Sequence, residues 1–181
     1  MQYINAEHIK KIKKGDVRSF ELLFNSYAES LLKFAVRYVH DLNIAEDIIQ
    51  NVFMTVWKYR SELQEQKNIK SYLFTITKNQ CLKYIRHNKV EQEYAARELS
   101  TESESTTPLD IVQEKETRHS INNAIQELPE KCRIIFCMNR FDRLTYAEIA
   151  EIQGISIKTV ETQMMRALKY LRKKLSHLNK K

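Results

Sequence analysis

The sequence contains very little glycine and very little proline, with 2 residues of each in 181. Proteins rich in β-structure need many glycines in their turns, so these counts favour an all-α protein whose helices are joined by short caps. The two glycines, Gly15 and Gly154, lie far apart. The chain therefore has no place for a glycine-rich phosphate-binding loop, which excludes most nucleotide-dependent enzymes.

Long apolar runs are also missing. No stretch approaches the roughly 20 apolar residues that span a bilayer, and the N-terminus lacks the apolar core of a signal peptide. We therefore expect a cytoplasmic protein with no direct membrane insertion.

Residues that bind metals or catalyse reactions are not clustered. The three cysteines, Cys81, Cys132 and Cys137, have no zinc-binding spacing, and their odd number does not suit a secreted disulfide framework. The five histidines are scattered, without the i,i+4 spacing of metal ligands. We expect reduced cysteines that serve packing, and no metal, cofactor, small-molecule substrate or catalytic residue.

Positive charge is in excess. There are 30 lysines and arginines against 23 acids, which gives a formal net charge of +7 and a pI near 9.2. Such a balance favours a polyanionic partner or an acidic protein surface. It does not distinguish DNA from RNA.

Three helices are predicted in the first 60 residues. Asn5 can cap the first, which Gly15 closes, and Asp16 can cap a second that runs to about His40. In the third, Asn43 and Glu46 resemble a capping box, and the helix is expected to end near Arg60. The second helix is expected to contribute four apolar residues to the protein core, namely Phe20, Leu23, Phe24 and Tyr27. The third helix has one broad apolar face, and its opposite face carries Asp47, Gln50, Asn51 and Met54.

A fourth helix is predicted from Ile69 to about His87, with Asn68 as its cap, after a loop over 61–66. From Lys67 to Lys89 the chain has no acid, and aromatic residues stand among its basic ones. This mixture suits single-stranded nucleic acid, because cations bind phosphates and rings stack on unpaired bases. A basic surface helix with aromatic core anchors is the alternative. The expected inner stripe is Ile69, Tyr72, Leu73, Ile76 and Ile85. The other side carries Ser71, Thr75, Lys78, Asn79, Lys83 and Arg86. Three rings, Tyr72, Phe74 and Tyr84, are interleaved among the basic residues.

The composition changes after Val90. Acids and a serine- and threonine-rich stretch from Ser100 to Thr107 replace the basic residues, and Pro108 follows. The segment has too little apolar content to pack. We therefore predict two small helical domains, 1–90 and 118–181, joined by a flexible acidic linker over 91–117.

The second domain ends in a predicted helix-turn-helix. Thr145 and Glu148 form a capping box, Gly154 ends that short helix, and Ser156 caps the next helix after a tight turn. The inner stripe of this last helix is expected to be Val160, Met164, Ala167, Leu168, Leu171 and Leu175. Its opposite stripe carries Lys158, Glu161, Thr162, Met165, Arg166 and Lys169, which suits a recognition helix in the major groove. An ordinary amphipathic helix with a solvated charged face is the alternative.

The combination resembles a bacterial sigma factor of the extracytoplasmic-function (ECF) group, which keeps only the second and fourth conserved regions. The resemblance covers about Ser19 to Leu175. It is carried by the run from Ala45 to Trp57 (AEDIIQNVFMTVW) and by Ser71 to Asn79 (SYLFTITKN). In the second domain it is carried by Leu128–Arg133 (LPEKCR), Thr145–Ala150 (TYAEIA) and Thr159–Thr162 (TVET).

The resemblance implies a protein that binds RNA polymerase core and directs it to promoters, and that is not itself an enzyme. Its partners would be the clamp helices and flap of the polymerase, duplex and single-stranded promoter DNA, and an anti-sigma factor that holds it inactive. The implied polymerase-binding residues are Asp47, Gln50, Asn51 and Met54. Implied contacts to the melted minus-ten element are Lys67, Tyr72, Thr75, Lys78, Asn79, Lys83 and Arg86. Implied contacts to the minus-thirty-five element are Lys158, Thr159, Glu161, Thr162, Met165, Arg166 and Lys169.

One departure concerns promoter sequence. The family often has a basic residue or serine where Glu161 and Gln163 stand. An acid facing DNA repels phosphate but can accept a hydrogen bond from a cytosine amino group. The promoter sequence therefore stays open.

Two other functions remain open on sequence grounds. A stand-alone helix-turn-helix regulator would explain residues 145–175 but leave the basic, aromatic helix without a role. An RNA-binding or ribosome-associated factor is supported by charge alone. An enzyme has no clustered acid–base set to support it.

Overall fold

The computed structural model describes residues 4–95 and 115–176, and within them every regular element is a helix. This agrees with the all-α prediction. The chain divides into two compact units, Met1–Ala95 and Ala96–Lys181. Most of the expected acidic linker, 96–114, lies outside the described residues.

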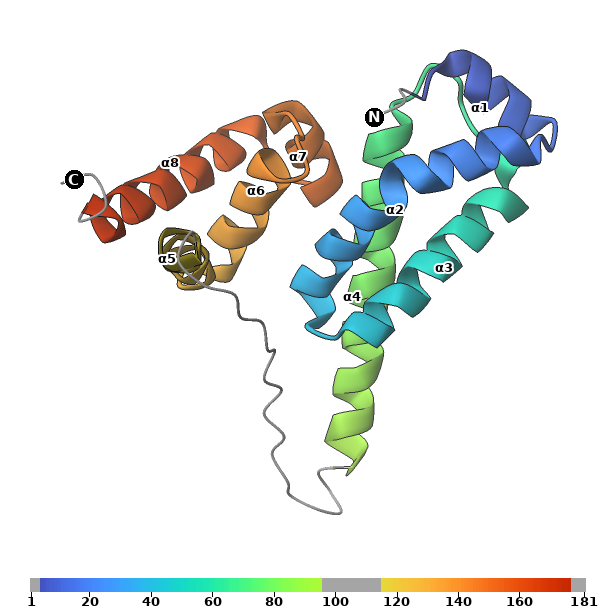
Figure 1. Cartoon of the computed structure of the whole chain (residues 1–181). Coiled ribbons are helices and arrows are strands. Elements are labelled where there is room, and N and C mark those ends of the chain that lie inside the picture. Colours follow the sequence, from blue (N-terminus) through green and yellow to red (C-terminus); the bar gives the residue numbers. More distant parts are fainter. Residues whose placement is uncertain (1–3, 96–114, 177–181) are drawn as a thin grey trace. The chain divides into compact units, whose positions relative to one another are not determined.

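Over residues 4–95, the N-terminal unit has four α-helices and one 3-10 helix. Helix α2 packs against both α3 and α4, and α1 lies against α2 and η1 (Figure 1). The elements are α1 (Ala6–Lys13), α2 (Val17–Val39), α3 (Leu42–Lys58), η1 (Arg60–Glu62) and α4 (Ile69–Ala95).

The helix starts of this unit follow from side-chain caps. As predicted, Asn5 and Asp16 cap α1 and α2, and Asp16 accepts from the backbone N–H of Ser19 at 2.9 Å. The predicted cap of α3 is wrong. Asp41, not Asn43, occupies that position, since its Oδ1 accepts from the N–H of Ile44 at 3.0 Å.

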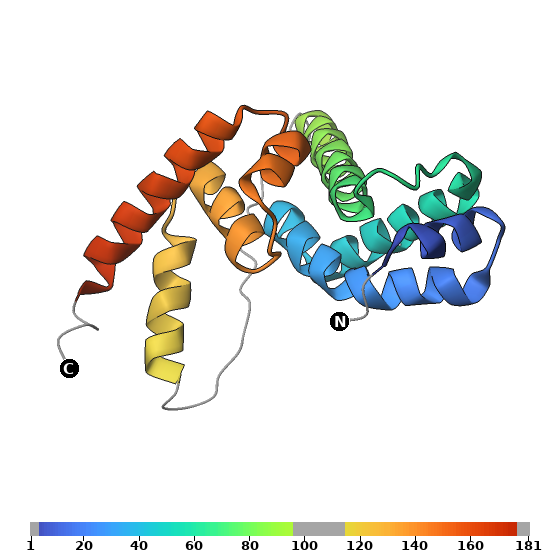
Figure 2. The same ribbon diagram turned by 90° about the horizontal axis from the view of Figure 1, so that it is seen from above.

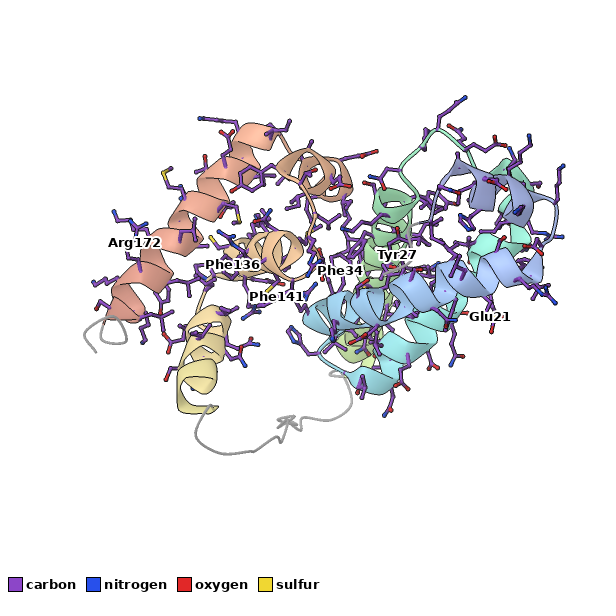
Figure 3. The ribbon with its side chains drawn as sticks, turned by 45° about the horizontal axis from the view of Figure 1, so that its top comes forward. Glu21, Tyr27, Phe34, Phe136, Phe141 and Arg172 are labelled. Atoms are coloured by element: carbon purple, nitrogen blue, oxygen red, sulfur yellow. The ribbon has the colours of Figure 1, made fainter. Side chains whose placement is uncertain are left out.

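Aromatic and aliphatic residues fix how α4 packs on α2. Phe34 of α2 lies 5.0 Å from Phe74 of α4, centroid to centroid, with the rings edge to face. Both side chains are fully buried, and Figure 3 shows Phe34 on the part of α2 that lies beside α4. Buried Leu73, Thr77 and Cys81 continue the same stripe of α4.

Helix α4 is longer than predicted, since it runs to Ala95 rather than His87. Nothing between these two residues stops a helix, because glycine and proline are both absent there and glutamate, glutamine and alanine favour helix. In Figure 1 the end of α4 extends past the ends of α2 and α3. The segment 61–66, which was predicted to be a loop, begins within a short 3-10 helix, η1.

The described part of the C-terminal unit, 115–176, has four helices. Helix α6 packs against α7 and α8, and α5 lies against α8 (Figure 2). The helices are α5 (Lys115–Gln126), α6 (Glu130–Arg140), α7 (Tyr146–Gln153) and α8 (Ile157–Lys174). Its core contains the buried side chains of Leu128, Met138, Leu144, Ile149, Ile152 and Met164.

The helix-turn-helix is formed as predicted. Thr145 and Glu148 make a reciprocal capping box at the start of α7, and Gly154 ends that helix in the left-handed region, with φ 69°. The hydroxyl of Ser156 then accepts from the N–H of Thr159 at 3.1 Å and caps α8. These local bonds fix the direction in which α8 leaves the turn.

The first testable prediction concerns Gly154. A Cβ there would meet no atom within 4 Å, so Gly154→Ala should be destabilising for backbone reasons alone. The left-handed conformation costs an L-residue about 1–2 kcal/mol, and we expect that loss in the free energy of unfolding of the C-terminal unit. Denaturant unfolding followed by circular dichroism measures it.

The only tryptophan, Trp57, lies in the N-terminal unit and provides the control. Its fluorescence transition should not move in Gly154→Ala. It should move in Gly15→Ala, since Gly15 is also left-handed (φ 88°) but belongs to the N-terminal unit. An unfolding free energy that Gly154→Ala leaves unchanged would contradict the assigned role of the turn.

Candidate nucleic-acid interface

The outer face of α3 is polar and exposed. Asp47, Gln50, Asn51 and Met54 all lie on it, and the Met54 side chain is 60% exposed. The opposite face is buried through Ile48, Ile49, Val52, Phe53 and Val56. The structure thus places the four residues predicted for the polymerase on one continuous surface.

An apolar groove of about 430 Å³ lies beside this face, between α2 and α3. The ring centroids of Phe20 and Trp57 lie 4.8 Å apart and those of Phe24 and Phe53 4.7 Å apart, with the rings of each pair tilted against each other. All four rings line the groove. Its lining consists of Val17, Phe20, Phe24, Gln50, Phe53, Met54 and Trp57.

The groove was missed at the sequence level. Phe24 was predicted in the core, but it is 41% exposed, and Val17 is 64% exposed. Helical spacing alone does not separate a buried ring from one at the edge of a groove. The one available signal is Val17, an apolar residue at the first position of a capped helix.

The outer face of α4 carries the residues predicted to bind an opened DNA strand. Tyr72 and Asn79 are exposed there, as are Lys83 and Arg86, while Thr75 and Lys78 are half-buried. Lys67 precedes the helix and is exposed. Asn68 caps α4, as predicted, by accepting from the N–H of Lys70 at 3.0 Å.

The predicted inner stripe of α4 is partly wrong. Tyr72 and Ile85 are 37% and 38% exposed, whereas Ser71 is buried. Phe74, one of the three interleaved rings, is fully buried, so it serves the core rather than a base. The reason is the contact of Phe74 with Phe34 of α2, which sets a rotation of α4 that differs from the predicted one.

Burial shifts the pKa values of two of the α4 side chains that are predicted to contact DNA. Desolvation lowers the pKa of Lys78 below its ordinary value. Desolvation, and then the nearby charge of Glu62, raise the pKa of Tyr72. Tyr72 therefore stays a neutral ring with a hydroxyl donor, the form that can stack on a base without repelling phosphate.

Residues predicted to bind polymerase and a residue predicted to bind DNA line a common groove between α3 and α4. Asp47 and Asn51 line the same groove as Lys83, together with Gln80, Tyr84 and His87. The sequence did not predict this meeting, because it depends on how the two helices pack. The C-terminal candidates lie in the other unit.

Helix α8 presents its predicted candidates outward. Lys158, Thr159, Glu161, Met165, Arg166 and Lys169 are exposed and Thr162 is half-buried. Val160, Met164, Ala167 and Leu171 form the buried face, as predicted. Leu168 was predicted on that face, but it is 37% exposed on the outer side, and Leu175 is half-buried.

The outer residues of α8 divide into two groups. Glu161, Met165 and Lys169 line a groove with Tyr146, at the start of α7. Arg166 instead lines a groove next to α6, where the thiol of Cys132 donates to Oε1 of Gln163 at 2.8 Å. Burial raises the pKa of the Cys132 thiol, although Arg166 acts against this.

The start and end of α8 are held by polar contacts. Lys158 Nζ lies 3.3 Å from Oε2 of Glu161. Near the other end, the hydroxyl of Tyr170 donates to Oε2 of Glu127 at 2.6 Å, and Lys174 pairs with the same carboxylate at 2.7 Å. The hydrogen bonds from Lys174 and Tyr170 lower the pKa of Glu127.

Other candidate sites find no support in the described part of the chain. Cys81, Cys132 and Cys137 are buried and form no disulfide, and burial raises the pKa of Cys81 to about 12. No group of three or more histidine, cysteine or acidic side chains there is arranged for a metal ion. None of the described helices has the length and apolar content to cross a membrane.

Comparison with known proteins gives matches to both units. A model of Sigma-70 region 2 matches residues 23–90, and a model of Sigma-70, region 4 matches residues 118–171. The chain is 27% identical to the ECF RNA polymerase sigma factor SigW of Bacillus subtilis (strain 168), over 98% of this chain and 100% of that protein. It is 24% identical to the ECF RNA polymerase sigma-E factor of Escherichia coli (strain K12), over 94% and 93% of the two chains.

Solved structures share the fold. The sigma factor RpoE of Bartonella quintana, in complex with the anti-sigma factor NepR, has a TM-score of 0.70 and 22% identity, over 88% of this chain and 98% of that one. CnrH, in complex with the cytosolic domain of CnrY, has a TM-score of 0.66 and 17% identity, over 96% and 97%. With both conserved regions present in order and full-length relatives of one kind, the chain belongs to the sigma-70 family of RNA polymerase sigma factors, in its extracytoplasmic-function group.

Proposed function

We propose that the chain binds bacterial RNA polymerase core and directs it to promoters by reading the minus-ten and minus-thirty-five elements. The observation that carries this is the presence of two different basic helices in two separate units. Helix α4 combines cations with an exposed ring, and α8 follows a helix-turn-helix. A stand-alone helix-turn-helix regulator would leave α4 and the match over residues 23–90 without explanation.

The first proposed role of the N-terminal unit, which the sequence bounds at residues 1–90, is to dock on the polymerase clamp helices. Asp47, Gln50 and Asn51 offer charged and polar contacts. The adjoining apolar groove can take the side chains of a partner helix, since Met54 and Phe24 stand exposed at its edge. A buried apolar centre with a polar rim is the usual anatomy of a protein interface.

The second proposed role of this unit is to hold the opened minus-ten strand along α4. Tyr72 offers a ring for stacking, and Asn79 offers an amide for a base edge. Lys67, Lys83 and Arg86 offer charge for phosphates. Capturing a displaced base is easiest when the strand is already single, which fits a surface that offers the exposed ring of Tyr72.

The proposed role of the C-terminal unit, bounded at 118–181 by the sequence, is to bind the duplex minus-thirty-five element and the polymerase flap. The N-terminal half of α8 would enter the major groove, as recognition helices do. Its proposed contacts are Lys158, Thr159, Glu161, Thr162, Met165, Arg166 and Lys169.

An anti-sigma factor is proposed as the negative regulator. The related fold of RpoE was solved with the anti-sigma factor NepR, and CnrH was solved with CnrY. The groove between α2 and α3 is an exposed apolar surface that such a partner could cover. We further propose that the chain acts in the cytoplasm and has no enzymatic activity of its own.

In-vitro transcription tests the proposal. Purified chain and bacterial core polymerase are mixed with a library of promoter fragments, and transcript starts are mapped. We expect starts at a shared pair of sequence elements only when the chain is present. A chain that fails to bind core polymerase, or that binds without changing the start positions, would overturn the proposed function.

A charge reversal on α3 is expected to weaken polymerase binding. Asp47 is exposed, so Asp47→Lys should leave the fold intact while placing a like charge against the partner surface. We expect binding at least tenfold weaker, about 1.4 kcal/mol, by fluorescence anisotropy of the labelled chain. Glu29→Lys is the matched control, because it makes the same charge change at an exposed position of α2. Equal affinities for the two variants would remove Asp47 from the interface.

Truncation of Arg166 tests the duplex contact. Arg166 is exposed on the outer side of α8, and a bidentate contact to a base or phosphate is worth about 1–3 kcal/mol. Arg166→Ala should lower the promoter affinity of the polymerase complex by that amount, measured at fixed salt. Arg140→Ala, an exposed arginine on α6, is the control. An unaltered footprint and affinity would rule out Arg166 as a contact.

A further inference from the structure

The outer side of α8 is unusually apolar for a helix that faces solvent. Met165 is 65% exposed, Ile157 48% and Leu168 37%. These three follow the helical repeat and lie on one stripe, with Glu161 among them. The side chains of this stripe are therefore available to a partner that offers both apolar and polar groups.

Hydrogen bonds within α8 reduce the number of its side chains that are available to contact DNA bases. The hydroxyl of Thr162 donates to the carbonyl of Lys158 at 2.8 Å, and the hydroxyl of Thr159 bonds to Ser156 Oγ at 2.9 Å. Glu161 uses Oε2 for Lys158 at 3.3 Å. Its Oε1 has no hydrogen bond within the described residues, so one carboxylate oxygen can still accept from a ligand.

We infer that Glu161 and Met165 act as a pair that gives the minus-thirty-five element its sequence preference in this protein. Glu161 Oε1 accepts from the amino group of a cytosine, and Met165 packs on the 5-methyl group of a thymine. Both groups lie in the major groove. The inference rests on the proposed function, because it requires α8 to enter that groove.

Helix geometry sets the distance between the two bases. Residues four apart rise by about 6 Å along an α-helix. Base pairs are spaced by about 3.4 Å. The cytosine and the thymine are therefore expected one or two base pairs apart.

The surrounding charges favour DNA over a protein partner for this stripe. Lys169 and Arg172 line the same groove as Met165, and Figure 3 shows Arg172 on the side of α8 that faces away from α5 and α6. These cations match phosphates on either side of a groove. Lys158 offsets the charge of Glu161, which reduces its repulsion of the DNA backbone. An apolar protein surface would have to desolvate all four charges.

The thymine contact is tested by removing the methyl group from the DNA. A promoter selected by the polymerase complex is remade with deoxyuridine in place of each thymine of the minus-thirty-five element in turn. We expect one position at which wild-type affinity falls about fourfold, the change that burying one methylene-sized group produces. With Met165→Ala, deoxyuridine and thymine should bind equally at that position. Ile121→Ala, an exposed apolar residue on α5, should keep the wild-type difference.

The cytosine contact is tested by promoter selection with Glu161→Gln. Glutamine pairs with the N6 and N7 edge of adenine, whereas glutamate accepts from cytosine N4. We expect the variant complex to select adenine where the wild type selects cytosine. That position should lie one or two base pairs from the methyl-sensitive thymine.

Three outcomes would overturn the inference. They are a wild-type complex that is insensitive to every deoxyuridine, a Met165→Ala variant that keeps the sensitivity, and a selection that Glu161→Gln leaves unchanged. In the second case the apolar stripe would be left for a protein partner. All three outcomes are measured only with complexes that form and initiate transcription at the promoter. Failure of the proposed function is distinguishable from them, because the chain would then not bind core polymerase.

Discussion

The packing of α4 against α2 is the contact on which the N-terminal unit depends. Phe34 and Phe74 meet edge to face in the core, and Leu73 lies beside them. Edge-to-face ring pairs add about 0.5–1.5 kcal/mol beyond burial, and they also fix the rotation of a helix. Once Phe74 points inward, Tyr72 and Asn79 must point outward. The aromatic core thus determines which cations and which ring of α4 are exposed to solvent.

In the C-terminal unit, local geometry determines which side of α8 is exposed. Its recognition helix has no aromatic pair to set its phase. Instead Gly154 and Ser156 fix the turn, and Val160 and Met164 anchor the first turns of α8 in the core. The exposed side of α8 then follows from spacing, which is why the sequence predicted which residues of this helix face outward, Leu168 excepted.

The features predicted correctly from the sequence are those that depend on residues close together in the chain. Capping by Asn5, Asp16, Thr145 and Ser156 depends on residues three apart, and all four caps were predicted. The cap of α3 was assigned wrongly because Asp41 and Asn43 are both good caps two residues apart, and only the end of α2 decides between them. The phase of α4 and the exposure of Phe24 depend on partner helices, which periodicity within one helix cannot show.

The groove between α3 and α4 has a thermodynamic consequence. Asp47 and Asn51 line it from one helix and Lys83 from the other. A ligand of the α3 face and a ligand of the α4 face therefore share charged neighbours, and their binding free energies are coupled. By linkage, whatever factor the first ligand applies to the affinity of the second is returned equally by the second to the first. Promoter DNA that is held along α4 would thus alter the affinity of the protein for its polymerase.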